Sequence, residues 1–228
     1  MVAALLIGLV LHGGWRLVRA PSPWPRLFLG SIGWIVGARR HSTGRPLRRD
    51  VFFISNHLSW IDILVLAGAT GSAFVAKDDL EQVPLIGWLC KLNHTIFVSR
   101  ADRLGVADQI ATIRAAVDAG WAVTVFPEGT TGTGRELLPF KAALLEVLDP
   151  PPPGVRVQPV SLDYGAATPA IAWGDETGQA NALRILARRG SFPANLIFRE
   201  PFAPADFPGR KAIAAEARRR MEPASGIC

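Results

Sequence analysis

Two residues whose types suit general-base catalysis, His57 and Asp62, stand five positions apart directly after a short apolar run. On one continuous helix this spacing corresponds to about 500° of rotation, so the two side chains would point to different faces. If His57 lies in a loop and Asp62 in the first turn of the next helix, the side chains can meet. The carboxylate would then hold one ring nitrogen of the imidazole and leave the other free to take a proton.

The same segment also has a purely structural interpretation. Ser59 and Asp62 are three residues apart, which is the spacing of a capping box at the start of a helix. In that arrangement the Asp62 side chain caps the helix and takes no part in chemistry. The spacing alone leaves both interpretations open.

A second candidate site is the glycine-rich segment 126–134, Phe-Pro-Glu-Gly-Thr-Thr-Gly-Thr-Gly, which again follows an apolar run. Glycines allow a close approach of the backbone, and hydroxyls with exposed N–H groups can bind an anion. The segment lacks the Gly-Lys-Ser/Thr ending of a P-loop and is not a dinucleotide-binding fingerprint. Glu128 would lie at the edge of a sheet beside a buried strand, where its charge needs a partner.

Two cations follow predicted strands. Arg100 comes directly after Phe97-Val98-Ser99, and Lys77 comes directly after Ala73–Ala76. A guanidinium or ammonium group at the end of a strand can bind a phosphate or a carboxylate. Each residue can equally be a solvated surface residue, so neither identifies a site alone.

From Asp50 onward, short β-rich runs alternate with helical segments. The clearest helix is Arg103–Ala119, whose apolar residues fall on one face: Val106, Ile110, Ile113 and Val117. The other predicted helices are Trp60–Gly68, Pro139–Leu148 and Pro208–Met221. The predicted strands are Val51–Ser55, Ala73–Ala76, Thr95–Val98, Ala122–Phe126, Val155–Asp163 and Asn195–Arg199. This alternation predicts an α/β domain with a mixed, mostly parallel central sheet flanked by helices.

The composition suits one globular domain, because 49% of the 228 residues are hydrophobic and 19% are charged. The two cysteines, Cys90 and Cys228, provide neither a disulfide framework nor the spacing of a metal site, which indicates a reducing, cytosol-facing location. Eight of the 25 basic residues and none of the 19 acidic residues fall within residues 1–49. Charges in the rest of the chain nearly balance, which argues against a nucleic-acid-binding groove.

The basic N-terminal region contains two apolar runs, Val2–Leu11 and Leu27–Gly37, separated by a proline-rich breaker. As a helix the first run would extend only about 15 Å, half of the hydrocarbon core of a membrane. We therefore expect a helical hairpin over residues 1–49 that dips into one leaflet, with its arginines on the anionic lipid surface. The alternative is a hairpin packed on the core of the domain, which would comprise residues 50–228.

Four blocks of the chain, taken in order, resemble those of the glycerophospholipid acyltransferase family. They are Asn56-His57-x4-Asp62, Lys77 to Arg100, Phe126 to Thr130, and Val157-Gln158-Pro159-Val160. The likeness is to the bacterial 1-acyl-sn-glycerol-3-phosphate acyltransferase branch, whose members act at the cytoplasmic face of the inner membrane. The resemblance implies an enzyme that moves a fatty acyl group from acyl-CoA or acyl carrier protein to the hydroxyl of a lysolipid, without a cofactor or metal.

The resemblance also implies a role for each site residue. His57 would be the general base that deprotonates the acceptor hydroxyl, and Asp62 would orient and stabilise it. The acceptor oxygen would attack the thioester directly, without an acyl-enzyme intermediate. The acceptor, first of all 1-acyl-glycerol-3-phosphate, would have its head group held by Arg100, Glu128, Gly129 and Thr130, with help from Lys77.

One position departs from the family pattern. Many members carry an arginine directly after Glu-Gly-Thr, where this chain has Thr131. Either Arg135 or Lys141 compensates, or the acceptor lacks a phosphomonoester, as in lyso-ornithine lipid. Two other classes stay open: a thioester or lipid hydrolase in which the same pair activates water, and a lipid-binding protein without activity. The segment Trp173–Glu176 has no assigned role.

Overall fold

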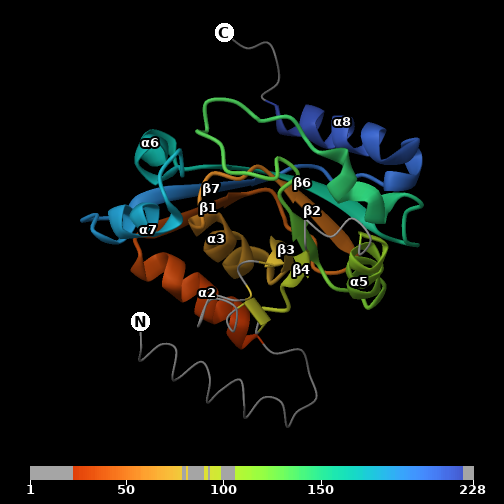
Figure 1. Ribbon diagram of the computed structural model, residues 1–228, viewed down its shortest axis with the longest axis horizontal. Helices are drawn as coiled ribbons and strands as arrows, with labels where there is room; N and C mark the ends of the chain where they lie inside the picture. Colours follow the sequence, from red (N-terminus) through yellow and green to blue (C-terminus); the bar gives the residue numbers. More distant parts are fainter. Residues whose placement is uncertain (1–22, 79–80, 82–89, 92, 99–105, 223–228) are drawn as a thin grey trace.

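The computed structural model describes residues 23–78, 81, 90–91, 93–98 and 106–222 (Figure 1). Its strands are β1 (Ala38–Thr43), β2 (Val51–Ser55), β3 (Ala73–Lys77), β4 (Ile96–Val98), β5 (Val123–Val125), β6 (Arg156–Asp163) and β7 (Phe192–Phe198). Within the described residues they form one seven-stranded sheet in the order β1-β7-β6-β2-β5-β3-β4. Neighbouring strands are parallel except β6 and β7, which are antiparallel. The predicted mixed, mostly parallel sheet is therefore confirmed.

Helices flank the sheet. The α-helices are α2 (Trp24–Ile35), α3 (Ile61–Thr70), α5 (Val106–Asp118), α6 (Thr168–Ile171), α7 (Gly178–Leu186) and α8 (Gly209–Met221). The described residues also form the 3-10 helices η3 (Ala142–Leu148), η4 (Gly165–Ala167) and η5 (Pro204–Asp206). No helix in the described part of the chain is long and apolar enough to cross a membrane.

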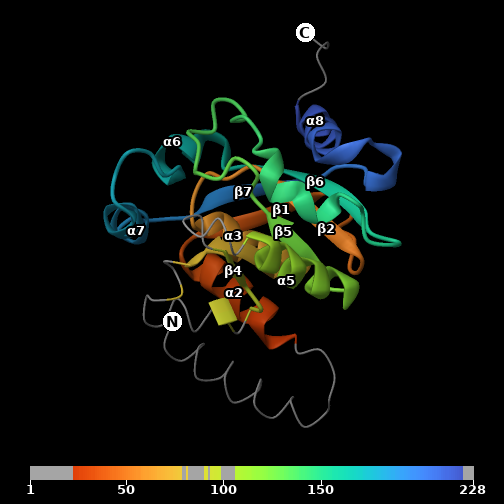
Figure 2. The ribbon, with the colours of Figure 1, turned by 45° about the vertical axis from the view of Figure 1, so that its right-hand side comes forward.

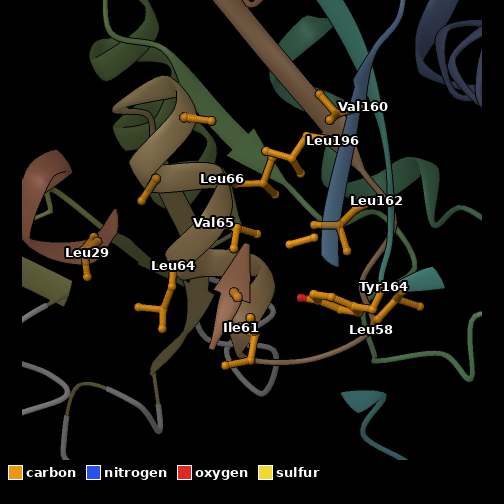
Figure 3. Packing of buried hydrophobic residues seen from close by; sticks show 14 of the residues in the cluster. Leu29, Leu58, Ile61, Leu64, Val65, Leu66, Val160, Leu162, Tyr164 and Leu196 are labelled. Atoms are coloured by element: carbon orange, nitrogen blue, oxygen red, sulfur yellow. The ribbon is translucent and has the colours of Figure 1, made fainter. Parts of the chain in front are cut away.

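Strand β2 lies near the centre of the sheet, and its alternating side chains divide the core in two. Val51 and Phe53 belong to a cluster with residues of α2 and α3, whereas Phe52 and Ile54 cluster with residues of α5, η3 and α8. All four side chains are fully buried. Figure 3 shows part of the first cluster, where side chains of α2, α3, β6 and β7 meet. In Figure 2, α2 accordingly lies below the sheet and α8 above it.

Helices α2 and α3 pack closely because glycines face each other where they touch. A Cβ atom on Gly68 would lie only 2.7 Å from the Cα atom of Gly30. A Cβ atom on Gly33 would lie 3.5 Å from that of Leu64, one turn earlier on α3. A side chain at Gly30 or Gly68 would push the helices apart and open the core beneath them.

The second apolar run of the expected N-terminal hairpin is α2, and it is part of the domain. Leu29 and Ile32 are buried in the core, and the following strand β1 pairs with β7. For this run, packing on the core of the domain is the observed arrangement, and residue 49 marks no break in the described fold. The first run lies outside the described residues, so its insertion into a membrane stays a prediction.

Several elements differ from the sequence-based prediction. The helices α6, α7, η4 and η5 are absent from it. Strand β1 is absent from it, because this edge strand reads Ala-Arg-Arg-His-Ser-Thr and exposes most of its side chains. Strand β7 starts three residues early and includes Pro193, which lies beyond the last pair between β7 and β6 and interrupts no bond there. The helix expected over Pro139–Leu148 begins only at Ala142 and is the 3-10 helix η3; before it, the Lys141 amide donates to the Pro127 carbonyl at 2.8 Å.

Candidate active site

His57 and Asp62 meet at the end of β2. The strand ends at Ser55, His57 lies in the loop, and Asp62 is in the first turn of α3. The Nδ1 atom of His57 lies 2.8 Å from Oδ2 of Asp62. The Asp62 side chain is fully buried, whereas 19% of the His57 side chain is exposed. The loop-and-first-turn geometry expected from the sequence is the one observed.

The Asp62 carboxylate also caps the loop. Oδ2 accepts hydrogen bonds from the amides of Leu58 at 2.6 Å and Ser59 at 2.9 Å. An oxygen that accepts two amide bonds holds no proton to donate, so Nδ1 of His57 carries the hydrogen of their shared bond. The capping and catalytic interpretations of Asp62 are thus not alternatives. One oxygen serves both arrangements and leaves Nε2 of His57 as the basic nitrogen.

Tyr164 completes the surroundings of Asp62 from the end of β6, the parallel neighbour of β2. Its hydroxyl donates to Oδ1 of Asp62 at 2.5 Å. Burial, together with the negative charge of Asp62, raises the pKa of Tyr164 well above its usual value, so the hydroxyl remains a donor. Figure 3 shows the tyrosine ring near the start of α3, where Asp62 stands. Sequence reasoning missed Tyr164, which follows β6 directly.

The backbone and ring of His57 are held from the loop after β5. The His57 amide donates to Oε2 of Glu128 at 3.0 Å, and its carbonyl accepts from the Gly132 amide at 2.7 Å. The imidazole stacks on Phe126 with 4.1 Å between ring centroids and 15° between planes. These contacts and the Asp62 bond fix the direction in which Nε2 points.

Glu128 is buried and meets backbone amides with both carboxylate oxygens. Oε2 accepts from His57, and Oε1 accepts from Leu138 at 3.0 Å. Burial raises the pKa of Glu128, while the bonds from these two amides pull that pKa down. The partners expected for the Glu128 charge are therefore two backbone amides, those of His57 and Leu138. The arrangement makes Glu128 a positioning residue for His57, and its contact with an acceptor stays a prediction.

The Glu-Gly-Thr turn brings a lysine to the site. Gly129 has a φ of +68°, which favours glycine, and a Cβ atom there would lie 2.9 Å from Nζ of Lys141. Thr130 is exposed beside it. Arg100 lies outside the described residues, as does the side chain of Lys77, whose backbone ends β3. Their predicted contacts with a head group stay predictions.

Trp173 joins the two loops of the site. Its amide donates to the Leu58 carbonyl at 2.7 Å, and its carbonyl accepts from the Thr131 hydroxyl at 2.9 Å. Thr131 is therefore occupied with a structural bond at the position where an arginine was expected. The segment Trp173–Glu176, which carries no sequence motif for this role, connects the His57 loop to the Glu-Gly-Thr loop.

An oriented imidazole with a buried carboxylate, at the carboxyl end of a central parallel strand, defines an α/β protein equipped for general-base catalysis. The acyltransferase family model matches residues 39–163, more than half of the chain. The chain therefore belongs to this acyltransferase family. Among the described residues, no group of three or more His, Cys, Asp and Glu side chains is placed to hold a metal.

The relatives carry two different names. The chain is 32% identical to a lyso-ornithine lipid O-acyltransferase of Rhodobacter capsulatus, over 94% of this chain and 83% of that protein. The corresponding protein of Brucella abortus is 31% identical over 93% and 84%. A 1-acyl-sn-glycerol-3-phosphate acyltransferase of Neisseria gonorrhoeae is 31% identical over 61% and 51%. The crystal structure of the acyltransferase PlsC from Thermotoga maritima has the same fold, with a TM-score of 0.64, 21% identity and coverage of 96% and 92%.

Proposed function

We propose that the protein transfers a fatty acyl group from an acyl thioester to the hydroxyl of lyso-ornithine lipid at a membrane surface. The observation that carries the proposal is the buried Asp62 carboxylate bound to Nδ1 of His57, which leaves Nε2 as the base. The donor is acyl-CoA or acyl-acyl carrier protein, which acts as a co-substrate, and the reaction requires no cofactor.

Two proton transfers through His57 accomplish the reaction. Nε2 takes the proton of the acceptor hydroxyl while the hydroxyl oxygen attacks the thioester carbonyl. The carbon–sulfur bond then breaks, the ester forms, and the imidazolium gives the proton to the leaving thiolate. The Asp62 charge stabilises the imidazolium between these two transfers. The protein forms no covalent bond to the acyl group.

Two observations favour lyso-ornithine lipid as the acceptor. Two relatives named for that substrate match more than nine tenths of this chain and two others match 67% and 68% of it, whereas the Neisseria enzyme matches 61%. In addition, Thr131 stands where many members of the family carry an arginine, and its hydroxyl is bound to the Trp173 carbonyl.

The second candidate acceptor is 1-acyl-glycerol-3-phosphate, and Lys141 supports it. The Lys141 ammonium lies against Gly129, directly before the exposed Thr130. This lysine supplies positive charge beside the Glu-Gly-Thr turn, which a phosphomonoester requires.

The decisive assay offers both lysolipids to the purified full-length protein in mixed micelles, with labelled acyl-CoA or acyl-acyl carrier protein, and resolves the products by mass. We expect labelled ornithine lipid to form with a higher kcat/KM than phosphatidic acid. The opposite order would make 1-acyl-glycerol-3-phosphate the acceptor. Labelled free fatty acid in place of an ester would indicate a hydrolase. Binding of lipid without turnover would indicate a lipid-binding protein.

Helix α2 is the described element best suited to contact the membrane. Its Leu27, Trp34 and Ile35 side chains are 55%, 62% and 44% exposed, and the Arg39 guanidinium lies 4.6 Å from the Trp34 ring centroid. We propose that this surface attaches the enzyme to the cytoplasmic face of the inner membrane, together with the apolar run Val2–Leu11.

Vesicle sedimentation tests this attachment. Because salt does not screen apolar contacts, high salt alone should leave the protein on anionic vesicles, whereas detergent should release it. Leu27→Gln should weaken binding. Leu183→Gln on α7, where the leucine is 62% exposed, is the matched control and should bind as the unchanged protein does. Release by salt alone would show that the protein binds the membrane only through electrostatic attraction.

A further inference from the structure

A pocket of about 730 Å³ opens beside the catalytic loop. One wall is the segment Thr133–Arg135, which follows the Glu-Gly-Thr turn. The other wall runs from Asp163 at the end of β6 through η4 and α6 to Glu176, before α7. In Figures 1 and 2, the segment after β5 and the helix α6 lie at the same end of the sheet. Arg135, one of the two residues considered in place of the missing arginine, lines this pocket, and so do residues 174–176, whereas the His57–Asp62 pair and the Glu-Gly-Thr turn do not.

Both walls of the pocket are attached to the residues next to the general base. The Gly132 amide donates to the His57 carbonyl, and the Trp173 amide donates to the Leu58 carbonyl. A Cβ atom on Gly134 would lie 3.4 Å from Leu58 on one side and 2.5 Å from Thr168 of the opposite wall on the other. A ligand in the pocket therefore lies alongside the loop that carries His57.

The pocket offers charges of both signs. Arg135 and Asp175 are exposed, and Asp163 is partly exposed. Asp163 accepts bonds from the Gly165 amide at 2.7 Å and from Asn195 at 3.0 Å, and both end on Oδ1. In the described part of the chain, no ion pair neutralises any of these three side chains. Glu176 and Arg184, by contrast, pair with each other and leave no net charge.

This charge pattern selects between the two candidate acceptors. The head group of an ornithine lipid carries a free carboxylate and a free ammonium on a short side chain. Arg135 offers a guanidinium for the carboxylate, and the two aspartates offer oxygens for the ammonium. A phosphomonoester, with a charge of about −1.5 to −2, would meet the two aspartates as like charges.

We infer that this pocket is the head-group subsite of the acceptor and that it recognises a zwitterionic amino-acid head group. Arg135 binds the carboxylate, and Asp163 and Asp175 bind the ammonium. The inference rests on the proposed function, since it assigns the substrate class that the same catalytic site acylates. It makes Asp163 and Asp175 specificity-determining residues, with no part in proton transfer.

Calorimetry with two soluble probes tests the subsite without turnover. N-octanoyl-ornithine carries the carboxylate and the ammonium, and N-octanoyl-norvaline has the same carbon skeleton without the ammonium. The full-length protein should bind the first about tenfold more tightly than the second, since one charge-assisted hydrogen bond has about that effect. Two single variants, Asp175→Asn and Asp163→Asn, should each remove this preference. Asp206→Asn, an exposed aspartate of η5 outside the pocket, is the matched control and should retain it.

The outcomes separate the subsite from the proposed function. Equal affinity for the two probes, or a preference that survives both aspartate substitutions, overturns the subsite even if the protein acylates lyso-ornithine lipid. A preference that Asp175→Asn removes supports the subsite, and if lyso-ornithine lipid is then not acylated, only the proposed acceptor is wrong. Because the Asp175 side chain is exposed, this variant should fold even if Asp163→Asn does not.

Discussion

The loops that follow β2 and β5 leave neighbouring parallel strands, but they are held in different ways. In the first loop, the amide, carbonyl and ring of His57 all bond to the protein, and Asp62 is buried under several donors. In the second loop, Glu128 is buried in the same manner. The residues that follow it, Thr130, Thr133 and Arg135, are exposed.

Under the proposed function, this difference separates the residues that carry out proton transfer from those that recognise the acceptor. The general base requires one orientation, and buried hydrogen bonds supply it because each would be expensive to break. Head-group recognition requires side chains that are accessible from solvent, and the exposed side chains of the second loop make few contacts with the rest of the protein. Under the proposed function, substitutions at the exposed residues of the second loop should change acceptor binding without disturbing His57, whereas Glu128 and Gly132 of the same loop hold the His57 backbone.

The largest effect should come from His57→Ala. Loss of a general base lowers kcat by about 10²- to 10⁴-fold. The melting temperature should change little, because the side chain is partly exposed and fills little of the core. Steady-state kinetics and thermal unfolding measure the two quantities. A variant that keeps more than a tenth of the activity would remove His57 from the reaction.

Asp62→Asn should have the next largest effect. The asparagine oxygen can still accept from the Leu58 and Ser59 amides, but the charge that stabilises the imidazolium is lost. We expect kcat to fall about 10- to 100-fold with only a modest loss of stability. Asp62→Ala, which leaves the amides without an acceptor, should unfold at a clearly lower temperature. Full activity of the asparagine variant with an unchanged pH–rate profile would reduce Asp62 to a cap.

Glu128→Gln should affect stability more than rate, and the effect should depend on pH. One of the two amides bound to Glu128 loses its acceptor, which costs about 1–3 kcal/mol. Because burial raises the pKa of Glu128, the folded protein holds that proton more tightly than the unfolded chain does. The stability of the unchanged protein therefore falls as pH rises through this pKa, whereas the variant lacks this fall.

The stability difference between the two proteins should thus be larger near pH 4 than near pH 8, as measured by urea unfolding. A difference that grows with pH would show that the two amides outweigh burial and lower the pKa of Glu128.

The smallest effect should come from Thr131→Ala. It removes one hydrogen bond to the Trp173 carbonyl in a partly exposed place, so KM for the acceptor should rise about two- to tenfold with kcat unchanged. Thr130→Ala changes the exposed neighbour, whose hydroxyl makes no such bond to the described part of the chain, and provides the comparison. A loss of kcat as large as that of Asp62→Asn would abolish the distinction between the two loops.

The parts of the site that depend on residues close together in the sequence could be predicted. The meeting of His57 and Asp62 follows from a strand end and a helix start five residues apart, and both were visible in the sequence. The need of Glu128 for a partner was also visible. Its partners were not, because they are the backbone amides of His57 and Leu138, which leave no mark on residue type.

Contacts between distant segments could not be predicted. Tyr164 reaches Asp62 across 102 positions of the chain, and Trp173 reaches Thr131 across 42. Only the folded sheet brings these pairs together. The environment of α2 was predicted in part, because an apolar run appears the same whether it faces lipid or core. This helix buries Leu29 and Ile32 and exposes Leu27 and Trp34.

The glycine contact between α2 and α3 links the position of α2 to the position of the His57–Asp62 pair. Helix α3 carries Asp62 in its first turn and Gly68 near its other end, where Gly30 of α2 abuts it without a side chain between them. Gly33 of α2 also packs on Leu64, one turn earlier on α3, so the two helices touch along part of their length and cannot shift independently. With α2 resting on lipid as proposed, the depth of α2 in the bilayer therefore also sets the position of Asp62, which orients the His57 ring.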